Sequence, residues 1–464
     1  MIRPKLSIMM LSLITMVATI ATAFDPPAGG DALTVLSSPV SMAGGATVAS
    51  TESPSADVLN PASSAAVQRT TFDASYVGLA GLGNESGLGH GINLGVAVPR
   101  SYGVWTGQLG LIHSPFDALS WGTLFTGRIG MAKDLTDALL VGIAVDTTLG
   151  SKDGFGWSVA ADIGAQGILG QVGFMDDFRW GAAFRNLGRA YTVPGSTGIS
   201  GTQSAGSFDS PFTPVFGASA DLLEAENAGL VLGANLDLGF PTFQNAILAA
   251  GLTLSWKDRL FVRTGWDFNL QEAMKGVDQG LMPSFGIGGS FSLKPAPAGQ
   301  ENQGFQGSEV RPAISAYQLP GGVWAFGTGA SLAIGPLDRE GPAIVVDYPA
   351  TSFQAYYISP NDDGTRDTVE LPLRIADKRY IKRYELRVYD ESGKIVRTIR
   401  DAENRPDAGG FRGFLARLRY VKKDVAVPTQ LVWDGKSENG QRVDDGLYTI
   451  VIEAADDNGS TTVT

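Results

Sequence analysis

The fold assignment rests on the stretch Gly229-Leu230-Val231-Leu232-Gly233-Ala234-Asn235-Leu236-Asp237-Leu238-Gly239-Phe240. One face of this stretch is apolar throughout, and it is formed by Leu230, Leu232, Ala234, Leu236, Leu238 and Phe240. The other face carries Gly229, Gly233, Asn235, Asp237 and Gly239. A period of two over this length is the pattern of a β-strand and not of a helix. We therefore expect a strand with one continuous apolar face.

The same alternation recurs through residues 70–348, where the positions opposite the apolar face are mostly Gly, Ala, Ser and Asn. A soluble β-sandwich also alternates, but it places Lys, Glu and Arg on its solvent face. The segments are about ten residues long, as needed to cross a bilayer at a tilt, whereas ordinary strands average about five or six. Tryptophans lie near the ends of the segments, as in the aromatic girdles of membrane barrels: Trp121, Trp157, Trp180, Trp256, Trp266 and Trp324. The sequence predicts an all-β protein built on a transmembrane antiparallel β-barrel.

The alternation predicts about fourteen strands, an even number, so both ends of the barrel would lie on the periplasmic side. The predicted strands are 70–79, 90–99, 103–113, 122–132, 138–149, 156–169, 179–187, 213–222, 229–240, 246–256, 260–269, 283–293, 323–334 and 342–348. Segments 188–211, 270–282 and 294–322 are rich in Gly, Ser or Gln and are predicted loops. The first two would be extracellular. The third falls on the periplasmic side, where its length is unusual for a turn.

Composition restricts the function of the 464-residue chain. It has no cysteine and two histidines, His90 and His113, which excludes thiol catalysis and Cys-based zinc sites. A formal net charge of −12 argues against nucleic acid as a partner. No Ser-His-Asp set and no phosphate-binding Gly-x-x-x-x-Gly-Lys loop is recognisable, so we predict a protein that is not an enzyme and does not couple transport to ATP.

The N-terminus has the pattern of a secretory signal peptide over residues 1–23. Arg3 and Lys5 precede an apolar run that is too short and too interrupted to span a membrane. Ala21-Thr22-Ala23 resembles a cleavage site, which would leave Phe24 as the first mature residue.

Residues 24–69 are predicted to form a plug, or hatch, inside the barrel. Asn60 is a good helix N-cap and Pro61 suits the first helical position, so a short helix is expected there. The alternative is a minor helix that only leads into the first strand. Parity places polar side chains in the lumen: Asp146, Asp162, Arg185, Asp221, Asn235, Asp237, Arg263, Asp267 and Asn269. They would hydrate the lumen and pair with one another, and the small inward residues leave space for the segment 24–69.

Two short motifs in the N-terminal segment carry a resemblance to a known family. Met42-Ala43-Gly44-Gly45-Ala46, followed by Ala56-Asp57 and Leu59-Asn60-Pro61-Ala62 and then the strands, resembles the FadL-type outer-membrane transporters, with PorV-like barrels and spirochaetal proteins among the relatives. The resemblance covers about residues 24–348. It implies a fourteen-stranded barrel with an N-terminal hatch that transports hydrophobic compounds such as long-chain fatty acids. Asn60, Pro61 and Ala62 would be hatch residues, with Gly44 and Gly45 in the same element.

Residues 350–464 are predicted to be a separate β-sandwich. Charged residues make up 37 of positions 351–464, 18 basic and 19 acidic, in a chain whose earlier part is poor in charge. The set Trp433-Asp434-Gly435, Asn439-Gly440 and Asp445-Gly446-Leu447-Tyr448 is similar to the immunoglobulin-like domain of flagellar hook-capping and bacterial surface proteins. The printed chain stops at Thr464, soon after a hairpin-like Asp457-Asn458-Gly459, which leaves open that further modules follow.

A possible calcium loop precedes this module. Asn361, Asp363 and Asp367 place oxygen atoms at intervals around Gly364, as a Ca²⁺ loop does. The alternative is a turn in which Asx side chains cap the backbone, because the loop lacks the glutamate of an EF-hand and contains Arg366.

Two functions follow from these patterns. The first is passive uptake of hydrophobic compounds such as fatty acids through a hatch-gated barrel in the bacterial outer membrane, with the lipid bilayer and the hydrophobic compounds as partners. The second is a structural or secretion-associated barrel that docks a periplasmic or surface protein through residues 350–464. The C-terminal module is expected on the periplasmic side.

Overall fold

A computed structural model describes residues 24–50, 54–82, 85–189, 194–201, 205, 212–280, 282–293, 307–338, 340–346, 358–361, 363–377 and 380–464. The predicted signal peptide, residues 1–23, lies outside these residues. The chain divides into two compact units, Met1–Pro336 and Leu337–Thr464, and each is described by itself. Within the described ranges, no helix combines the length and the apolar character needed to cross a membrane.

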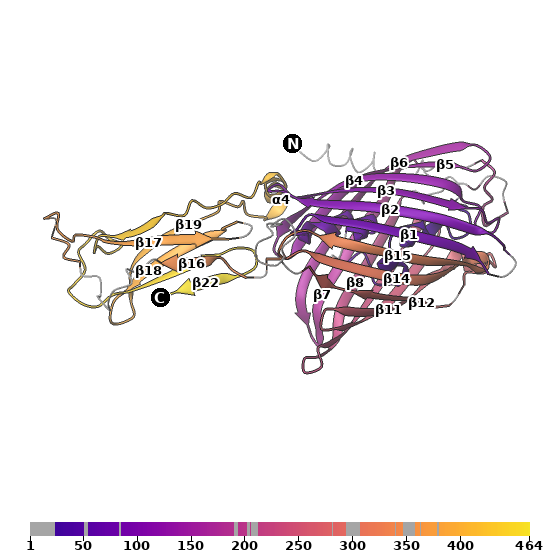
Figure 1. Ribbon diagram of the computed structural model, residues 1–464. Helices are drawn as coiled ribbons and strands as arrows, with labels where there is room; N and C mark the ends of the chain where they lie inside the picture. The colour runs from indigo at the N-terminus through magenta and orange to yellow at the C-terminus, as the bar shows by residue number, and fades with distance from the viewer. Residues whose placement is uncertain are drawn as a thin grey trace, which may run out of the picture. The chain divides into compact units, whose positions relative to one another are not determined.

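The first unit is a closed antiparallel barrel in which neighbours in sequence are neighbours in the sheet (Figure 1). Its strands are β1 (Thr71–Gly81), β2 (Leu88–Pro99), β3 (Val104–Ser114), β4 (Gly122–Thr136), β5 (Leu139–Ser151), β6 (Phe155–Val172), β7 (Met175–Arg189), β8 (Thr213–Ala225), β9 (Leu230–Gly239), β10 (Ile247–Trp256), β11 (Leu260–Asn269), β12 (Ser284–Gly289), β13 (Phe291–Ser292), β14 (Glu309–Leu319) and β15 (Val323–Ala333). The barrel closes where β1 pairs with β15 along its whole length. Both β12 and β13 pair with β14, so they are two pieces of one interrupted strand and the wall has fourteen strands.

The predicted number of strands is confirmed, but two of the predicted assignments are wrong. Strand β14 lies inside 294–322, which was predicted to be a loop. Its first residues include Glu309, Arg311 and Pro312, and these interrupt the alternation that otherwise marks a strand. Conversely, the predicted last strand, 342–348, is not in the barrel: β16 (Ala343–Val346) pairs with a strand of the second unit. The barrel therefore ends at Ala333, and the second unit begins at Leu337, earlier than the predicted position 350.

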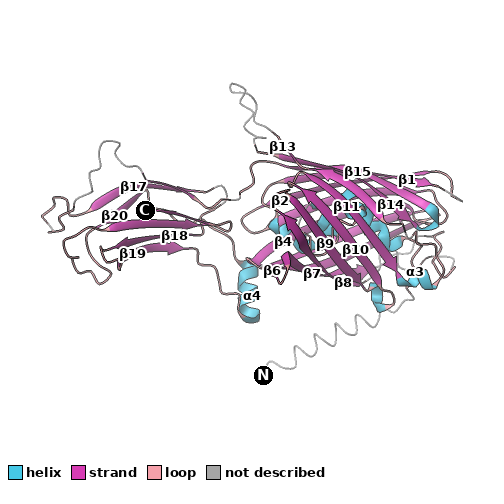
Figure 2. Cartoon of the chain, turned by 90° about the horizontal axis from the view of Figure 1, so that it is seen from below, coloured by secondary structure: helices cyan, strands magenta, loops and turns pink. Residues whose placement is uncertain are grey.

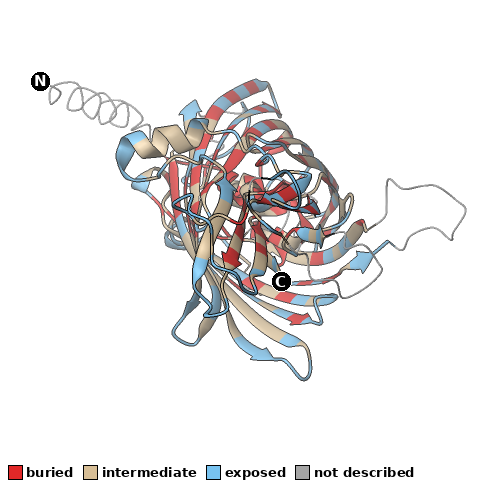
Figure 3. Ribbon diagram, turned by 90° about the vertical axis from the view of Figure 1, so that its left-hand side faces the viewer, coloured by how far each residue is buried: buried red, intermediate tan, exposed pale blue. Residues whose placement is uncertain are grey.

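The apolar face of each strand is turned outward and is exposed. Side chains such as Leu236, Leu254 and Trp266 are 47%, 44% and 49% exposed, although neighbouring positions on the same strands are covered. Figure 3 shows this alternation as bands across the strands. A soluble monomer rarely exposes so large a contiguous apolar surface, and a closed barrel that does so is matched to the hydrocarbon of a bilayer.

The two ends of the barrel differ. One end has short turns, including 100–103, 137–138 and 257–259, apart from the long connection 293–308, and β1 starts and β15 finishes at this end. The opposite end carries longer connections, including 115–121 and 240–246. The predicted loops 188–211 and 270–282 fall mainly between β7 and β8 and between β11 and β12, at the end with long connections.

The second unit contains two antiparallel sheets, which Figure 2 shows with helix α4 (Gly410–Arg419). Their strands are β16, β17 (Val369–Ala376), β18 (Arg383–Tyr389), β19 (Ile395–Ala402), β20 (Gln430–Trp433), β21 (Thr449–Ala455) and β22 (Ser460–Val463). One sheet has the order β16-β17-β20 and the other β19-β18-β21-β22. Side chains from both sheets, among them Leu386, Leu431 and Trp433, form one buried core. The immunoglobulin-like type of this unit stays a prediction.

An ion-pair cluster in the second unit predicts its acid sensitivity. Burial alone would raise the pKa of Asp457, but Lys422 at 2.7 Å and Arg405 at 3.7 Å hold this pKa down to about 2. A carboxyl whose folded pKa lies below its unfolded value stabilises the fold above pH ~4, and this contribution is lost as the pH falls towards 2. We expect Asp457 to contribute about 2 kcal/mol to the unfolding free energy that the fragment 337–464 loses over this range, and Asp457→Asn to remove that contribution.

Trp433 is the only tryptophan of that fragment and is 4% exposed, so its fluorescence can follow urea unfolding at each pH. Asp445→Asn, at an exposed position, is the matched control. An unchanged acid response of Asp457→Asn would contradict the prediction.

Candidate functional site: the N-terminal segment inside the barrel

The described residues of the N-terminal segment, 24–50 and 54–69, lie within the barrel as a series of short helical pieces (Figure 2). They are η1 (Gly30–Ser37), α2 (Pro39–Met42), η2 (Pro54–Val58) and η3 (Pro61–Ala66). Met42, Val48, Asp57 and Asn60 are at most 1% exposed. The segment buries these residues against the barrel: Met42 packs in an apolar cluster with barrel residues, whereas Asp57 and Asn60 are buried in polar contacts.

Asn60 begins η3 and also fixes the segment to the wall. Its side-chain oxygen accepts a hydrogen bond from the Ala62 amide at 3.0 Å, and Pro61 is the first helical residue. The predicted cap is thus confirmed, on a 3₁₀ helix. The Asn60 amide Nδ2 donates to the carbonyl of Val48 at 2.6 Å, within the segment, and to that of Ala165 on β6 at 3.1 Å. One buried side chain therefore joins two parts of the segment to a strand.

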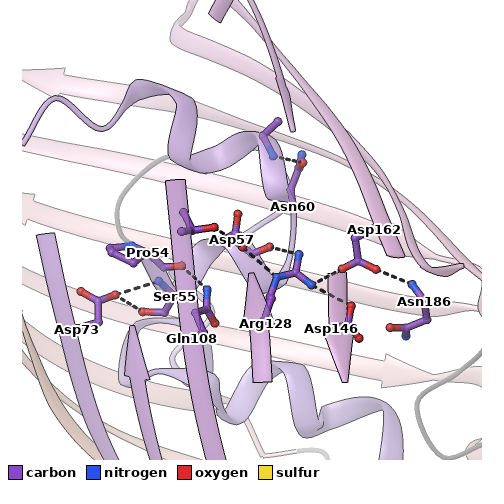
Figure 4. Close-up of polar contacts among 12 residues, drawn as sticks. Pro54, Ser55, Asp57, Asn60, Asp73, Gln108, Arg128, Asp146, Asp162 and Asn186 are labelled. Atoms are coloured by element: carbon purple, nitrogen blue, oxygen red, sulfur yellow. Dashed lines mark hydrogen bonds and ion pairs between the residues drawn. The ribbon is translucent and has the colours of Figure 1, made fainter. Parts of the chain in front are cut away.

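Arg128 on β4 is the centre of a buried ion-pair cluster, drawn in Figure 4. Its Nε lies 2.9 Å from Oδ2 of Asp57, and its Nη2 donates to the Asp57 carbonyl at 2.8 Å. Its Nη1 lies 2.5 Å from Asp162 and 3.3 Å from Asp146. The other oxygen of Asp162 accepts the amide of Asn186 at 2.6 Å. The Arg128 guanidinium thus ties η2 to β4, β5 and β6.

The other lumen residues predicted from parity lie as follows. Asn235 donates to the Gly44 carbonyl at 2.9 Å, and Asp237 accepts the Thr47 hydroxyl and, at 3.0 Å, the Val48 amide. Arg263 is 5% exposed and lies beside Gly45. Arg185 and Asp267 line a cavity described below. Asp221 lines a separate hollow near the short turns, and Asn269 caps α3 (Leu270–Met274).

Glycines on the inner wall let the backbone of the segment approach closely. A Cβ on Gly142 would lie 2.3 Å from the Pro61 carbonyl carbon, and one on Gly181 would lie 2.1 Å from the Val48 carbonyl oxygen. Similar close approaches occur at Gly251, Gly265 and Gly286. The contacting atoms at Gly142 and Gly181 are backbone atoms, which no side-chain rotation can move away. These wall glycines are a docking surface that only a residue without a side chain can form.

The segment's own glycines, Gly44 and Gly45, complete this packing. Gly44 has φ +73°, a left-handed conformation that side chains disfavour, and a Cβ there would lie 2.6 Å from Cα of Gly265. A Cβ on Gly45 would lie 2.3 Å from Cδ of Arg263.

A connection at the long-loop end also touches the segment. The Gly29 amide donates to Oε1 of Glu272, in α3, at 2.7 Å. Burial raises the pKa of Glu272 to about 7. Asn269 donates from Nδ2 to Asp31 at 3.1 Å. The start of the segment is therefore held by the connection between β11 and β12.

A cavity of about 110 Å³ remains between the segment and the wall. Its apolar lining includes Val35, Leu59 and Ile247, and charged groups including Arg185 and Asp267 also face it. An apolar cavity with a few convergent polar groups is the usual form of a small-molecule site. Its volume is below the roughly 150 Å³ that holds benzene in an engineered cavity, so a long chain needs the segment to move.

The two histidines do not take part in this site. His90 and His113 are opposite each other on β2 and β3 and lie on the exposed face of the wall. The Nδ1 of His90 lies 2.5 Å from the Tyr76 hydroxyl, and that of His113 lies 2.8 Å from the Thr123 hydroxyl.

The possible calcium loop forms its own hydrogen bonds. The two oxygens of Asp367 accept the amides of Asn361 and Gly364, and Oδ1 of Asp363 accepts the Thr365 amide at 2.7 Å. These are the contacts of a turn capped by Asx side chains, the alternative drawn from the sequence. Calcium at Asn361, Asp363 and Asp367 stays a prediction.

Arg128 and Asp57 form the centre of the cluster, and the sequence analysis assigned a role to neither: Arg128 was not named, and Asp57 appeared only within a motif. Arg128 stands directly opposite Asp146 in the β4–β5 register, so parity with the predicted lumen aspartate could have placed it. Its pairing with Asp57 joins residues 71 positions apart, and no local pattern signals that contact.

No protein-family model matches this chain, and neither does any curated protein sequence. Among solved structures, the Ralstonia pickettii toluene transporter TbuX is 13% identical, with 64% of this chain and 98% of that chain covered and a TM-score of 0.40. The Pseudomonas putida toluene transporter TodX is 12% identical, with 68% and 100% covered and a TM-score of 0.40. A Pseudomonas aeruginosa FadL homologue is 14% identical, with 68% and 98% covered and a TM-score of 0.32.

Proposed function

We propose that this protein is a passive channel for hydrophobic compounds in the bacterial outer membrane, with residues 24–69 as its hatch. The observation that carries the proposal is the largely apolar cavity between the segment and the wall, inside a barrel whose exterior is matched to lipid. Such a compound crosses poorly wherever a polar surface layer covers the bilayer. A cavity lined by Val35, Leu59 and Ile247 shelters it from water, and its burial there is favourable.

The hatch must rearrange for transport. Its elements contact the wall through polar clusters at Arg128, Asn60 and Asp237 and through close backbone contacts at glycines. The polar contacts can be exchanged for water, but Leu36 and Met42 of the segment also pack in a buried apolar cluster with barrel residues such as Trp121. Moving the first part of the segment therefore also exposes apolar surface, whereas η2 and η3 are held mainly by the polar clusters and the glycine contacts. Long-chain fatty acids are the substrate class that we propose to test first.

Asn60→Ala is expected to increase uptake several-fold. The change removes the helix cap and two donated hydrogen bonds, and the loss of buried hydrogen bonds costs about 1–3 kcal/mol. A less tightly docked hatch opens more often. The measurement is whole-cell uptake of a labelled long-chain fatty acid in a host without its own channel for such compounds. Pro61→Ala tests the same helix, and Asn439→Ala, at an exposed turn, is the control.

Uptake no greater with the wild-type protein than with an empty vector would refute the channel. Uptake with the wild type but not with Asn60→Ala would keep the channel and overturn the blocking role of the hatch.

The second candidate is a barrel that docks a protein partner through Leu337–Thr464. The observation that favours it is a separately folded unit with its own core, which transport through the barrel does not use. The chain enters this unit from the short-turn end, and we propose that it lies in the periplasm. A pull-down with residues 337–464 that captures the same protein in repeated experiments, and fails with a core-disrupting Leu386→Asp fragment, would support this role.

A further inference from the structure

Helix α4 is an amphipathic basic helix whose side chains are not part of a core. Its sequence is Gly-Phe-Arg-Gly-Phe-Leu-Ala-Arg-Leu-Arg. None of its residues is buried: Phe411 is exposed, and Phe414, Leu415 and Leu418 are half-buried. Phe411 is 75% exposed, in a unit whose other large apolar side chains mostly lie in the core between the two sheets. The helix is a ten-residue part of the connection between β19 and β20, and neither sheet needs it for strand pairing.

The apolar side chains of α4 form one stripe. Phe411, Phe414, Leu415 and Leu418 follow the spacing i, i+3, i+4 and i+7, which places them on one face of a helix. At 100° per residue, Arg412 and Arg419 lie along one edge of this stripe and Arg417 lies near the other. Long basic side chains at the edges of an apolar stripe can reach headgroups while the stripe enters the hydrocarbon.

The charge within α4 and the four residues after it has a single sign, and Asp407 and Asp424 flank this segment. From Gly410 to Lys423 the sequence contains five basic residues and no acidic residue. Lys422 is engaged with Asp457, whereas Arg412, Arg419 and Lys423 are exposed and Arg417 is half-buried. Asp407, just before the helix, bonds to the Gly409 amide at 3.2 Å. A surface that complements α4 therefore offers an apolar region to the stripe and anionic groups to the basic side chains beside it.

We propose that α4 binds the surface of a bilayer containing anionic phospholipid, as a peripheral anchor for the second unit. A lipid surface is favoured over a soluble acidic protein because the same chain carries a barrel with a lipid-matched exterior. A covalent tether to the bilayer supplies a high effective concentration, so even a short helix with a weak intrinsic affinity binds. The proposal does not depend on what the barrel transports.

The absence of cysteine allows a single-site fluorescent label. Phe411→Cys can be labelled with the environment-sensitive dye NBD in the full chain, reconstituted into liposomes of pure phosphatidylcholine or with added phosphatidylglycerol. We expect a blue shift and quenching by doxyl-lipids in the anionic liposomes, weakened by high salt. NBD at Asn439→Cys, an exposed turn of the same unit, should show neither change. Both leaflets have the same composition, so the orientation of insertion does not affect the result.

Charge reversal separates specific binding from dye insertion. Arg412→Glu/Arg419→Glu should raise the phosphatidylglycerol fraction needed for a half-maximal shift by about tenfold, or abolish the shift. Arg374→Glu/Arg400→Glu, at exposed positions on the sheets, changes the net charge equally and should leave the shift intact. No shift in either lipid would overturn the proposal and direct attention to a soluble partner. An equal shift with and without phosphatidylglycerol would overturn its anionic part.

Discussion

Arg128→Met is expected to release residues 54–66 from the barrel wall while the barrel itself stays folded. The substitution leaves Asp57, Asp146 and Asp162 in a buried site without the guanidinium that neutralises them. Breaking a buried ion pair by removing one partner costs about 3–5 kcal/mol. The cheapest relief is for Asp57 to leave, because η2 is otherwise held mainly by side-chain hydrogen bonds such as those of Asp73 and Gln108, whereas β5 is paired with β6 along its whole length. Arg128→Lys should fail as well, because one ammonium cannot replace a guanidinium that reaches three carboxylates.

Hydrogen exchange in detergent micelles measures this release directly. Amides of residues 54–66 should exchange at least about a hundredfold faster in Arg128→Met, since 1.4 kcal/mol corresponds to a factor of ten. Amides in β4 and β5 should be little affected. The matched control is Arg179→Met, which breaks the pair between Arg179 and Asp177, where the Asp177 side chain is 49% exposed. Exposed pairs contribute about 0–1 kcal/mol, so its exchange pattern should be that of the wild type.

A compensating variant distinguishes charge from shape. Arg128→Met/Asp57→Asn/Asp146→Asn/Asp162→Asn removes all three uncompensated carboxylates together with the arginine. Replacing an entire buried ionic group by neutral side chains is often nearly neutral for stability. Protection of residues 54–66 should therefore return in large part. If it does not, the geometry of the guanidinium, and not its charge, holds η2.

The strands of the barrel could be predicted from the sequence because each one has lipid on one side and a small-residue interior on the other. Because of this difference, apolar residues alternate with small or polar residues along each strand, as from Leu230 to Leu238. Prediction from this pattern fails where the strand begins with charges and Pro312, as in β14, and where a short alternating run, Ala343–Val346, belongs to the other unit. The alternation of apolar and small residues predicts which face of a strand is turned to lipid. It does not predict which other strand that strand pairs with.

The sequence predicted the helix start at Asn60 and most of the polar residues in the lumen, but it did not predict the contact between Arg128 and Asp57. Asn60 and Pro61 signal a helix start locally, and the cap follows from those two residues alone. The contact of Arg128 with Asp57 depends on how the segment lies in the closed barrel. The two residues are far apart in the sequence. A single charged residue on the inner face of a strand could equally well be hydrated by water in the lumen, so the sequence alone does not predict the contact.

The wall glycines lead to the second large expected effect. Gly142→Ala/Gly181→Ala should displace the segment from β5 and β7, because each new methyl group would overlap backbone atoms of Pro61 or Val48. Overpacking costs about 1–3 kcal/mol per site, and here the displaced atoms belong to the segment and not to the paired strands. An alanine at either position is compatible with the pairing of the strands.

The readout uses Ser63→Cys, a position on η3 that is 1% exposed in the docked segment. A water-soluble maleimide should label it slowly in the parent and at least about tenfold faster in Gly142→Ala/Gly181→Ala, since the two costs together exceed 1.4 kcal/mol. Gly107→Ala/Gly239→Ala is the matched control, because a Cβ at those glycines would find its nearest neighbours at ordinary contact distances of 3.5 and 3.7 Å. Equal labelling of both double variants would show that the segment does not depend on close backbone approach. Fast labelling only in the first would show that the wall glycines exist to seat the segment, since their replacement would leave the strand pairing unchanged and alter only what the lumen can hold.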